Sequence, residues 1–127
     1  MTELREEAVE YFTETEEEFV VLLCQMAMRK NTAKLLVFLA GRPEASSRAI
    51  EHGTDLRQPE ISIAVNDMKD RGWITYRAHS PDKKGRPAIN YSLAKPLPEI
   101  IDGIEKTEKR EASRQLELIR KMRDYSE

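Results

Sequence analysis

The sequence predicts an α+β fold that is mainly α-helical and contains one β-hairpin. Apolar residues recur every three to four positions along residues 14–72, which is the period of an amphipathic helix. Between residues 73 and 94 the period changes to two, as in β-strands, and from residue 99 the helical period returns. The 127 residues are 39% hydrophobic and 35% charged, which suits one charge-rich helical domain.

The N-terminal 30 residues predict two helices. The first carries apolar side chains at helical spacing, namely Leu4, Ala8, Tyr11 and Phe12. The second begins at a capping box, formed by Thr13 with Glu16 or by Thr15 with Glu18, and continues to about Met28. Its apolar residues lie on so many sides that we expect burial on more than one face.

A third helix is predicted over residues 33–40. Asn31 or Thr32 is its expected N-cap, because these short polar side chains accept a hydrogen bond from a free backbone N–H. Gly41, followed by Pro43, ends it.

Two helices joined by a tight turn follow. The first begins at residue 45 with Ser46 or Ser47 as its cap and ends before Gly53, at a place where a left-handed residue commonly closes a helix. The second begins near Pro59, whose missing N–H costs nothing there, and ends at Gly72. Its predicted inward residues are Ile61, Ala64, Val65 and Met68, and its outward ones are Gln58, Glu60, Ser62, Ile63, Asn66 and Asp67. Such a pair is a helix-turn-helix.

Residues 73–79 and 88–94 predict two strands of a hairpin. Apolar residues alternate with polar ones at Ile74, Tyr76 and Ala78 in the first strand and at Ile89, Tyr91 and Leu93 in the second. The turn-rich segment between them, residues 80–87, carries three positive charges and one aspartate. We therefore expect a basic wing at the tip of the hairpin.

Residues 99–125 predict one long helix. At 1.5 Å per residue it spans roughly 40 Å, which is too long to lie wholly against so small a domain. Its apolar residues are Ile100, Ile101 and Ile104 at the start and Ala112, Leu116, Ile119 and Met122 toward the end. We expect a partner chain to cover them.

Charge is strongly segregated along the chain, although the formal net charge is only -2. Residues 1–27 hold eight acids and one base, residues 28–95 hold thirteen bases and seven acids, and residues 96–127 hold seven bases and eight acids. The middle segment therefore has a net charge of +6, which favours binding of a polyanion through that segment.

Catalysis and metal binding find no support in the sequence. There is no Ser/His/Asp set, no Gly-rich phosphate loop and no pair of carboxylates on a cleft-forming scaffold. His52 and His79 have no partner at metal-ligand spacing, and Cys24 lies in an apolar stretch that suits a small buried hydrophobe. We expect neither an enzyme, nor a metal, nor a cofactor.

The apolar runs are short, and the longest cover residues 19–24 and 35–40. A membrane-spanning helix needs roughly 18 apolar residues, so none is expected. The first residues are acidic and lack the basic and apolar regions of a secretion signal. A cytoplasmic location is the expectation.

The order of these elements resembles the winged helix-turn-helix regulators of the MarR, ArsR and TrmB-like groups, over about residues 30–97. Residues 56–65, Leu-Arg-Gln-Pro-Glu-Ile-Ser-Ile-Ala-Val, are similar to the start of their recognition helices, and Gly72-Trp-Ile leads into the wing. Residues 84–87, Lys-Gly-Arg-Pro, with Tyr91-Ser-Leu resemble a wing pattern common in prokaryotic, notably archaeal, members. The resemblance divides the chain into N-terminal helices (1–30), the winged helix-turn-helix (31–96) and a dimerisation helix (97–127).

The resemblance implies a transcription regulator that reads double-stranded DNA without a cofactor. The helix of residues 58–71 would enter the major groove, and the wing of residues 80–87 would lie at the minor groove. The expected DNA-binding residues are Arg48, Arg57, Gln58, Pro59, Glu60, Ser62, Ile63, Asn66, Arg77, Lys83, Lys84, Gly85 and Arg86. Gln58 and Asn66 suit adenine, whereas Arg86 suits a narrow minor groove.

Three acids on the presumed recognition helix, Glu60, Asp67 and Asp70, depart from this picture because they repel phosphates. Ile63 also stands where many relatives are expected to have a basic residue. Glu60 can accept from cytosine N4, and Ile63 can meet a thymine methyl. The alternative hypothesis is a winged-helix module for protein–protein interaction without specific DNA binding.

A homodimer that binds a near-palindromic operator is the expected assembly. The expected dimerisation residues are Leu4, Ala8, Phe12, Ile101, Ile104, Leu116, Ile119 and Met122. Two-fold symmetry would place half-sites about 34–36 Å apart or at a multiple of that spacing. The sequence names no small-molecule effector.

Overall fold

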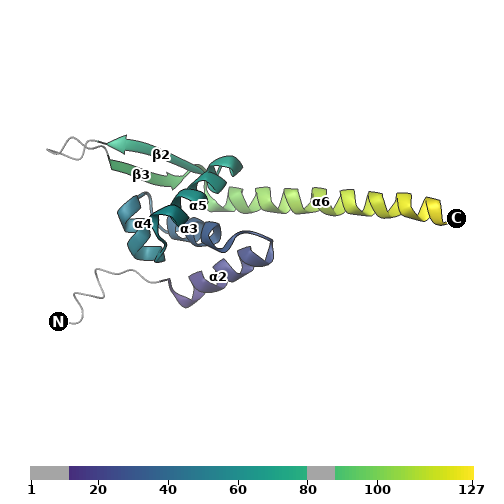
Figure 1. Cartoon of the computed structure of the whole chain (residues 1–127), viewed down its shortest axis with the longest axis horizontal. Helices are drawn as coiled ribbons and strands as arrows, with labels where there is room; N and C mark the ends of the chain where they lie inside the picture. Colours follow the sequence, from purple (N-terminus) through teal and green to yellow (C-terminus); the bar gives the residue numbers. More distant parts are fainter. Residues whose placement is uncertain (1–11, 80–87) are drawn as a thin grey trace. The chain divides into compact units, whose positions relative to one another are not determined.

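The structure, a computed structural model, describes residues 12–79 and 88–127 and shows the predicted class of fold. In chain order the elements are α2 (Glu14–Gln25), α3 (Lys30–Ala40), β1 (Ala45–Ser46), α4 (Ser47–Thr54), α5 (Gln58–Arg71), β2 (Ile74–His79), β3 (Ala88–Leu93) and α6 (Leu97–Ser126) (Figure 1). Residues 1–95 and 96–127 form two compact units. The first is a winged helix-turn-helix, and the second is a long helix.

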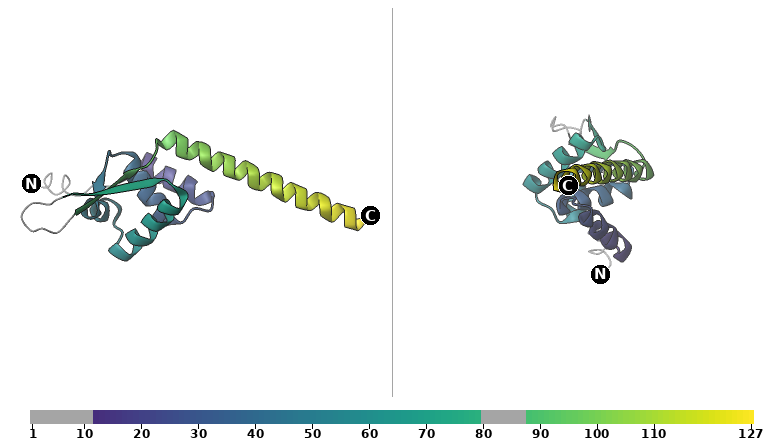
Figure 2. Two further views of the ribbon diagram at one scale, coloured as in Figure 1. Left: turned by 90° about the horizontal axis from the view of Figure 1, so that it is seen from above. Right: turned by 90° about the vertical axis from the view of Figure 1, so that its right-hand side faces the viewer.

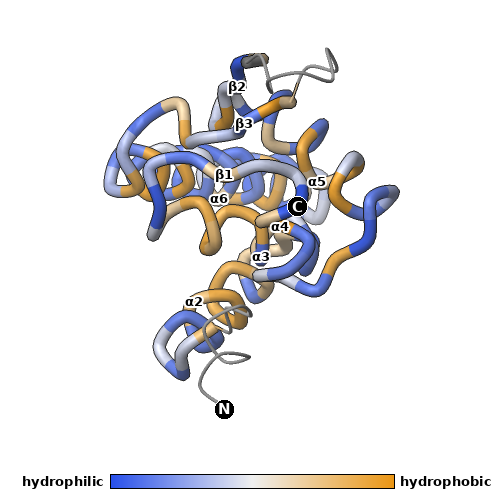
Figure 3. Tube along the Cα trace, turned by 90° about the vertical axis from the view of Figure 1, so that its left-hand side faces the viewer, coloured by the Kyte–Doolittle hydropathy of each residue, from blue (hydrophilic) through white to orange (hydrophobic). Residues whose placement is uncertain are grey.

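Helix α3 lies at the centre of the first unit. Its hydrophobic residues contact α2 on one side and α4 and α5 on the other (Figure 3). The fully buried side chains of this helix are Thr32, Ala33, Leu35, Leu36, Phe38 and Leu39. An 11-residue helix that is buried on nearly every side must be covered by several elements, and this explains its continuous apolar sequence.

The sheet is antiparallel with strand order β1-β3-β2, and it packs against the helices of this unit (Figures 1 and 2). The predicted apolar faces of the hairpin are confirmed, because Ile74 pairs with Leu93, Tyr76 with Tyr91 and Ala78 with Ile89. The predicted helix from residue 45 is wrong at its start. Ala45 and Ser46 form β1 opposite Tyr91 and Asn90, and a strand of two residues is too short to produce a periodic pattern.

The capping box of α2 is formed by Thr13 and Glu16, which was one of the two predicted alternatives. The Glu16 N–H donates to Thr13 Oγ1 at 3.1 Å, and the Thr13 N–H donates to Glu16 Oε1 at 2.8 Å. The predicted end at Met28 and burial on more than one face are wrong. The helix ends at Gln25, its buried residues are Val20 and Leu23, and Leu22 is 59% exposed.

The predicted N-cap of α3 is also wrong. The helix begins at Lys30 with Arg29 as its N-cap residue, so Thr32 lies inside the helix. Thr32 instead donates its hydroxyl proton to Asp67 Oδ2 of α5 at 2.7 Å. The local signal for a cap was a side chain that serves a long-range hydrogen bond.

The turn between α4 and α5 differs from the prediction at Gly53. Gly53 lies within α4, and the left-handed residue is Asp55, with φ 61°. Thr54, which is buried, donates to the carbonyl of Ile50 at 2.6 Å and accepts from the N–H of Leu56 at 3.2 Å. These bonds link the end of α4 to the residue that precedes the N-cap of α5.

Helix α5 confirms the predicted inward face, because Ile61, Ala64, Val65 and Met68 are all buried. Gly72 ends the helix with φ 77°, as predicted from the left-handed conformation that glycine favours. The helix begins at Gln58, one residue before Pro59, so the proline occupies the first turn.

Helix α6 has 30 residues and begins two residues before the predicted start. Pro98 lies in its first turn, where an N–H has no intrahelical acceptor. Ion pairs three or four residues apart follow the helix, namely Glu105 with Lys109, Glu111 with Arg114 and Glu117 with Arg120. In the part of the chain that the structure describes, no helix is long and apolar enough to cross a membrane.

Candidate nucleic-acid interface

The outward face of α5 is the centre of the candidate interface. At 100° per residue, the side chains directly opposite the buried stripe are Pro59, Ser62, Ile63, Asn66 and Asp70. All five are exposed, and Ile63 is 55% exposed. Gln58, at the first position of the helix, is exposed as well. Uncharged polar and apolar groups therefore dominate this face.

Two of the three acids of α5 make hydrogen bonds within the chain. The Glu60 carboxylate accepts the backbone N–H of Arg57 at 2.9 Å and so caps the start of the helix. Asp67, predicted to point outward, is only part-exposed, and it accepts from Thr32 and from Arg71 Nε, the latter at 3.0 Å. Both acids thus have structural partners that a phosphate would not supply.

The surroundings of Asp67 favour its charged form. Burial alone would raise the pKa of this carboxyl, but the hydrogen bonds from Thr32 and Arg71, together with the charge of Arg71, outweigh burial. The pKa of Asp67 therefore lies below its usual value of 3.8. Asp67 stays ionised and connects α5 to α3 at neutral pH.

The basic residues at the end of α5 lie over aromatic rings of the β2 region. Lys69 Nζ lies 4.5 Å from the centre of the Tyr76 ring, and the Arg71 guanidinium lies 4.9 Å from the centre of the Trp73 ring. Such cation–π contacts stabilise by about 0.5–1 kcal/mol at exposed sites. These two cations hold α5 against the hairpin.

Two predicted phosphate contacts, Arg48 and Arg57, are exposed at the surface of the helix-turn-helix. Arg48 lies in the first turn of α4, and Arg57 is the N-cap residue of α5. Their guanidinium groups are thus available to solvent at the starts of two consecutive helices.

Arg77 of β2, another predicted phosphate contact, is bound within the chain. Its Nε and Nη2 donate to the two carboxylate oxygens of Glu44 at 3.2 and 3.0 Å. Asn90 of β3 donates to the same carboxylate at 3.3 Å. The hydrogen bond and the charge of Glu44 raise the pKa of Arg77. Sequence reasoning missed Glu44, because 33 residues separate it from Arg77 and no local pattern links the two.

Several predicted site residues lie outside the described part of the chain. They are Leu4 and Ala8 near the N-terminus and Lys83, Lys84, Gly85 and Arg86 of the wing tip. They remain predictions from the sequence.

Residues 31–85 match the sequence profile of the MarR family. These residues are a winged helix of the MarR family. The match covers the helix-turn-helix, β2 and the sequence that leads into the wing. The protein is therefore a MarR-type winged-helix regulator, a class that binds double-stranded DNA and regulates transcription.

A crystal structure of M. tuberculosis Rv0081 is similar in fold to this MarR-type chain. The two are 17% identical with a TM-score of 0.50, and the similarity covers 82% of this chain and 99% of that one. Identity at this level supports the fold alone. None of the curated proteins matches the sequence.

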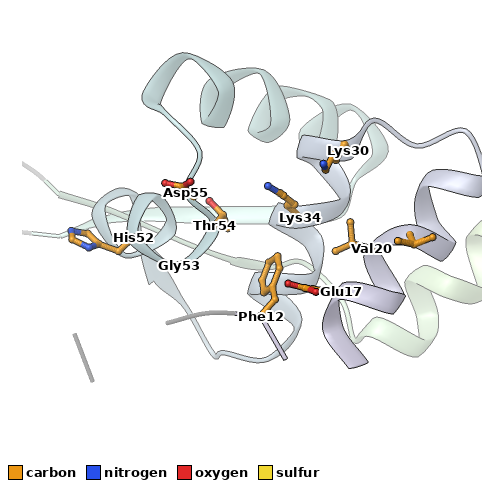
Figure 4. Close-up of a pocket in the computed structure, with 10 residues that line it drawn as sticks. Phe12, Glu17, Val20, Lys30, Lys34, His52, Gly53, Thr54 and Asp55 are labelled. Carbon is orange, nitrogen blue, oxygen red and sulfur yellow. The ribbon is translucent and has the colours of Figure 1, made fainter. Parts of the chain in front are cut away.

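The MarR-type unit also contains a pocket between α2, α3 and the end of α4 (Figure 4). Its volume is about 650 Å³, and Lys34 points toward Thr54 and Asp55 inside it. Phe12, a predicted dimerisation residue, lines the same pocket. Its charged residues have both signs, and no buried side-chain N or O atom among the described residues lacks a hydrogen-bond partner. The pocket therefore selects no particular ligand class.

Cys24, expected to be buried, is only part-buried and free of a disulfide. Among the described residues, no group of three or more His, Cys, Asp or Glu side chains is arranged to hold a metal ion.

Proposed function

We propose that this chain is a homodimeric regulator that binds a specific, near-palindromic sequence of double-stranded DNA. The observation that carries the proposal is the outward face of α5, where Ser62, Ile63 and Asn66 are exposed opposite a fully packed inner face. A helix held in this way presents its side chains in a fixed order, which is what reading of base edges requires.

The chemistry of this face suits the major groove. The Asn66 amide can donate to adenine N7 and accept from adenine N6, and the same holds for Gln58. Ile63 can contact a thymine methyl, whereas Ser62 can serve a base edge or a phosphate. Glu60 is available to cytosine N4 only through an oxygen that does not cap Arg57, so we assign it a smaller part in specificity.

Affinity in this proposal comes from phosphate contacts of the basic middle segment. Arg48 and Arg57 are exposed on the helix-turn-helix, and Lys83, Lys84 and Arg86 are basic residues of the wing sequence. Contacts of this kind position the protein without reading sequence. Because Arg77 already binds Glu44, a phosphate must compete with that carboxylate for it.

Dimerisation through α6 would place two recognition helices on the operator. In the described structure Ile101, Leu116, Ile119 and Met122 of this helix are exposed, and Leu116 is 64% exposed. A second chain that covers these side chains would remove their apolar surface from water. Two-fold symmetry then predicts two half-sites of inverted sequence.

One observation favours the alternative, an interaction module for proteins. The exposed Ile63 and the unpaired position of Asp70 on the outward face of α5 also suit a partner with apolar and basic groups. Salt dependence separates the two, since each phosphate contact lowers log K by about 0.9 per unit of log salt concentration.

The test is selection of genomic DNA fragments with the purified chain at about 150 mM salt, followed by binding assays on the selected sequence. We expect one enriched near-palindrome. Asn66→Ala should weaken binding by about 1–3 kcal/mol and relax preference at one base pair of each half-site. Arg57→Ala should weaken all sequences alike and lower the salt slope by about one per contact.

Gln25→Ala, which removes an exposed amide of α2, is the matched control and should leave DNA binding unchanged. Recovery of no preferred sequence would contradict specific recognition. Binding that ignores salt would contradict a phosphate interface and favour the protein-partner alternative.

A further inference from the structure

We propose that α6 pairs with α6 of a second copy in antiparallel orientation. The inference rests on the homodimer proposed above and adds the direction in which the two helices run. It uses only residues of α6, so the placement of this helix relative to the rest of its own chain does not enter.

The apolar seam of α6 matches itself when the helix is reversed. At 100° per residue the seam positions 101, 104, 108, 112, 115, 119 and 122 fall within a sector of about 80°. If Ile101 of one copy meets Met122 of the other, then Ile104 meets Ile119, and Ala112 lies next to the two-fold axis. Each large apolar residue of the seam then meets another apolar residue.

The polar middle of the seam distinguishes the two orientations. In a parallel, in-register pair Glu108 would face Glu108 of the partner, and two like charges at close range repel. In the antiparallel pair Glu108 faces Gln115, whose amide can donate to the carboxylate. The antiparallel seam therefore has no like-charge contact at its centre.

Net charge along the helix favours the same orientation. Residues 97–111 hold five acids and three bases, a net charge of -2, whereas residues 112–126 hold four bases and two acids, a net charge of +2. Antiparallel pairing brings the acidic half of one helix against the basic half of the other. Parallel pairing brings like halves together, and the helix dipoles would add to that repulsion.

The ends of the pair support a longer interface than the seam alone. In the antiparallel arrangement Asp102 lies near Arg123 of the second copy, and Glu105 lies near Arg120. The carboxylate of Glu105 already has an ion pair with Lys109 at 3.0 Å, and Arg120 pairs with Glu117 at the same distance. A second helix can extend both pairs into a charge network along the flank.

Disulfide trapping tests the orientation. In a Cys24→Ser background, the variants Ile104→Cys and Ile119→Cys are each oxidised alone, and the two are also co-expressed and oxidised together. We expect neither variant alone to crosslink, and we expect the co-expressed pair to give a 104-to-119 disulfide, identified by mass spectrometry of the joined peptides. Ser113→Cys, on the opposite face of the helix, is the control that reports random collision.

Ile104→Cys that crosslinks efficiently by itself would overturn the antiparallel pair and indicate a parallel one. A dimer by sedimentation equilibrium whose co-expressed variants give no crosslink above the Ser113→Cys control would overturn the α6 pair while leaving the dimer intact. A monomeric unmodified chain would overturn both the pairing and the proposed homodimer. DNA binding of the reduced variants, measured separately, shows whether the recognition surface is retained.

Discussion

Gly53 and Asp55 occupy places that their residue types do not suggest. Gly53 adopts an ordinary helical conformation, yet a Cβ built on it would overlap the ring of Phe38. That ring is buried, and the Arg42 guanidinium lies over it, 3.8 Å from its centre. Gly53 is therefore required by the close approach of α4 to α3, whereas the left-handed conformation belongs to Asp55.

Gly53→Ala is expected to destabilise the protein. Helix propensity alone would stabilise it by about 0.5–1 kcal/mol, but overpacking against a buried ring costs about 1–3 kcal/mol, so the clash dominates. Urea unfolding measures the difference, and Gly53→Ala combined with Phe38→Leu should recover part of the loss. Asp55→Gly is the contrasting change and should not destabilise, because glycine adopts the left-handed conformation without strain. A gain in stability from Gly53→Ala would show that the ring moves aside freely.

At the scale of elements, the position of α5 depends on a polar contact as well as on its apolar stripe. Thr32 of α3 donates to Asp67 of α5, and Arg71, one turn later in α5, donates to the same carboxylate. Lys69 and Arg71 also lie over Tyr76 and Trp73. The rotation of α5 about its axis, and hence the residues that face outward, is set by both kinds of contact.

Asp67→Asn is expected to make stability less dependent on pH. The pKa of Asp67 is lowered in the folded chain, so its charged form stabilises the fold above the unfolded-state pKa of about 3.9 and loses that effect as pH falls through the lower, folded value. Urea unfolding should show wild type more stable than Asp67→Asn by about 1–2 kcal/mol at pH 7, with the difference shrinking below about pH 4. Thr32→Val is the second variant, and it should couple to Asp67→Asn in a double-mutant cycle. A difference that stays constant from pH 7 to pH 3 would contradict this account.

At the scale of the whole molecule, function in our proposal depends on a second copy. One recognition helix contacts only half of a palindromic site, and binding of two linked half-sites is far tighter than binding of one. The exposed apolar residues of α6 are the surface that we assign to this association.

Ile104→Asp combined with Ile119→Asp is expected to convert a dimer to a monomer and to weaken operator binding. The two positions face each other in the proposed pair, so four carboxylates would be placed in an apolar seam, which is strongly unfavourable. Sedimentation equilibrium measures the mass, and a DNA titration measures the loss. Ser113→Asp adds the same charge on the opposite face of α6 and should leave the dimer intact. An unchanged mass of the double variant would remove α6 from the interface.

The order of the elements followed from the amino-acid pattern because the signals are local. The inward face of α5, the left-handed Gly72 and the facing apolar residues of the hairpin all depend on neighbours within a few positions, and all were confirmed. The candidate recognition face of α5 follows from the same periodicity, since the residues opposite a buried stripe are exposed.

Long-range contacts decided the features that the pattern mispredicted. Thr32 carries the signal of a helix cap but binds Asp67, and Gly53 carries the signal of a helix end but makes room for Phe38. Glu44 and Arg77 gave no signal, although the sheet brings them within 3.0 Å of each other. A short polar side chain or a glycine has several uses that look alike in sequence, and only the residues that pack against it in three dimensions determine which use it has.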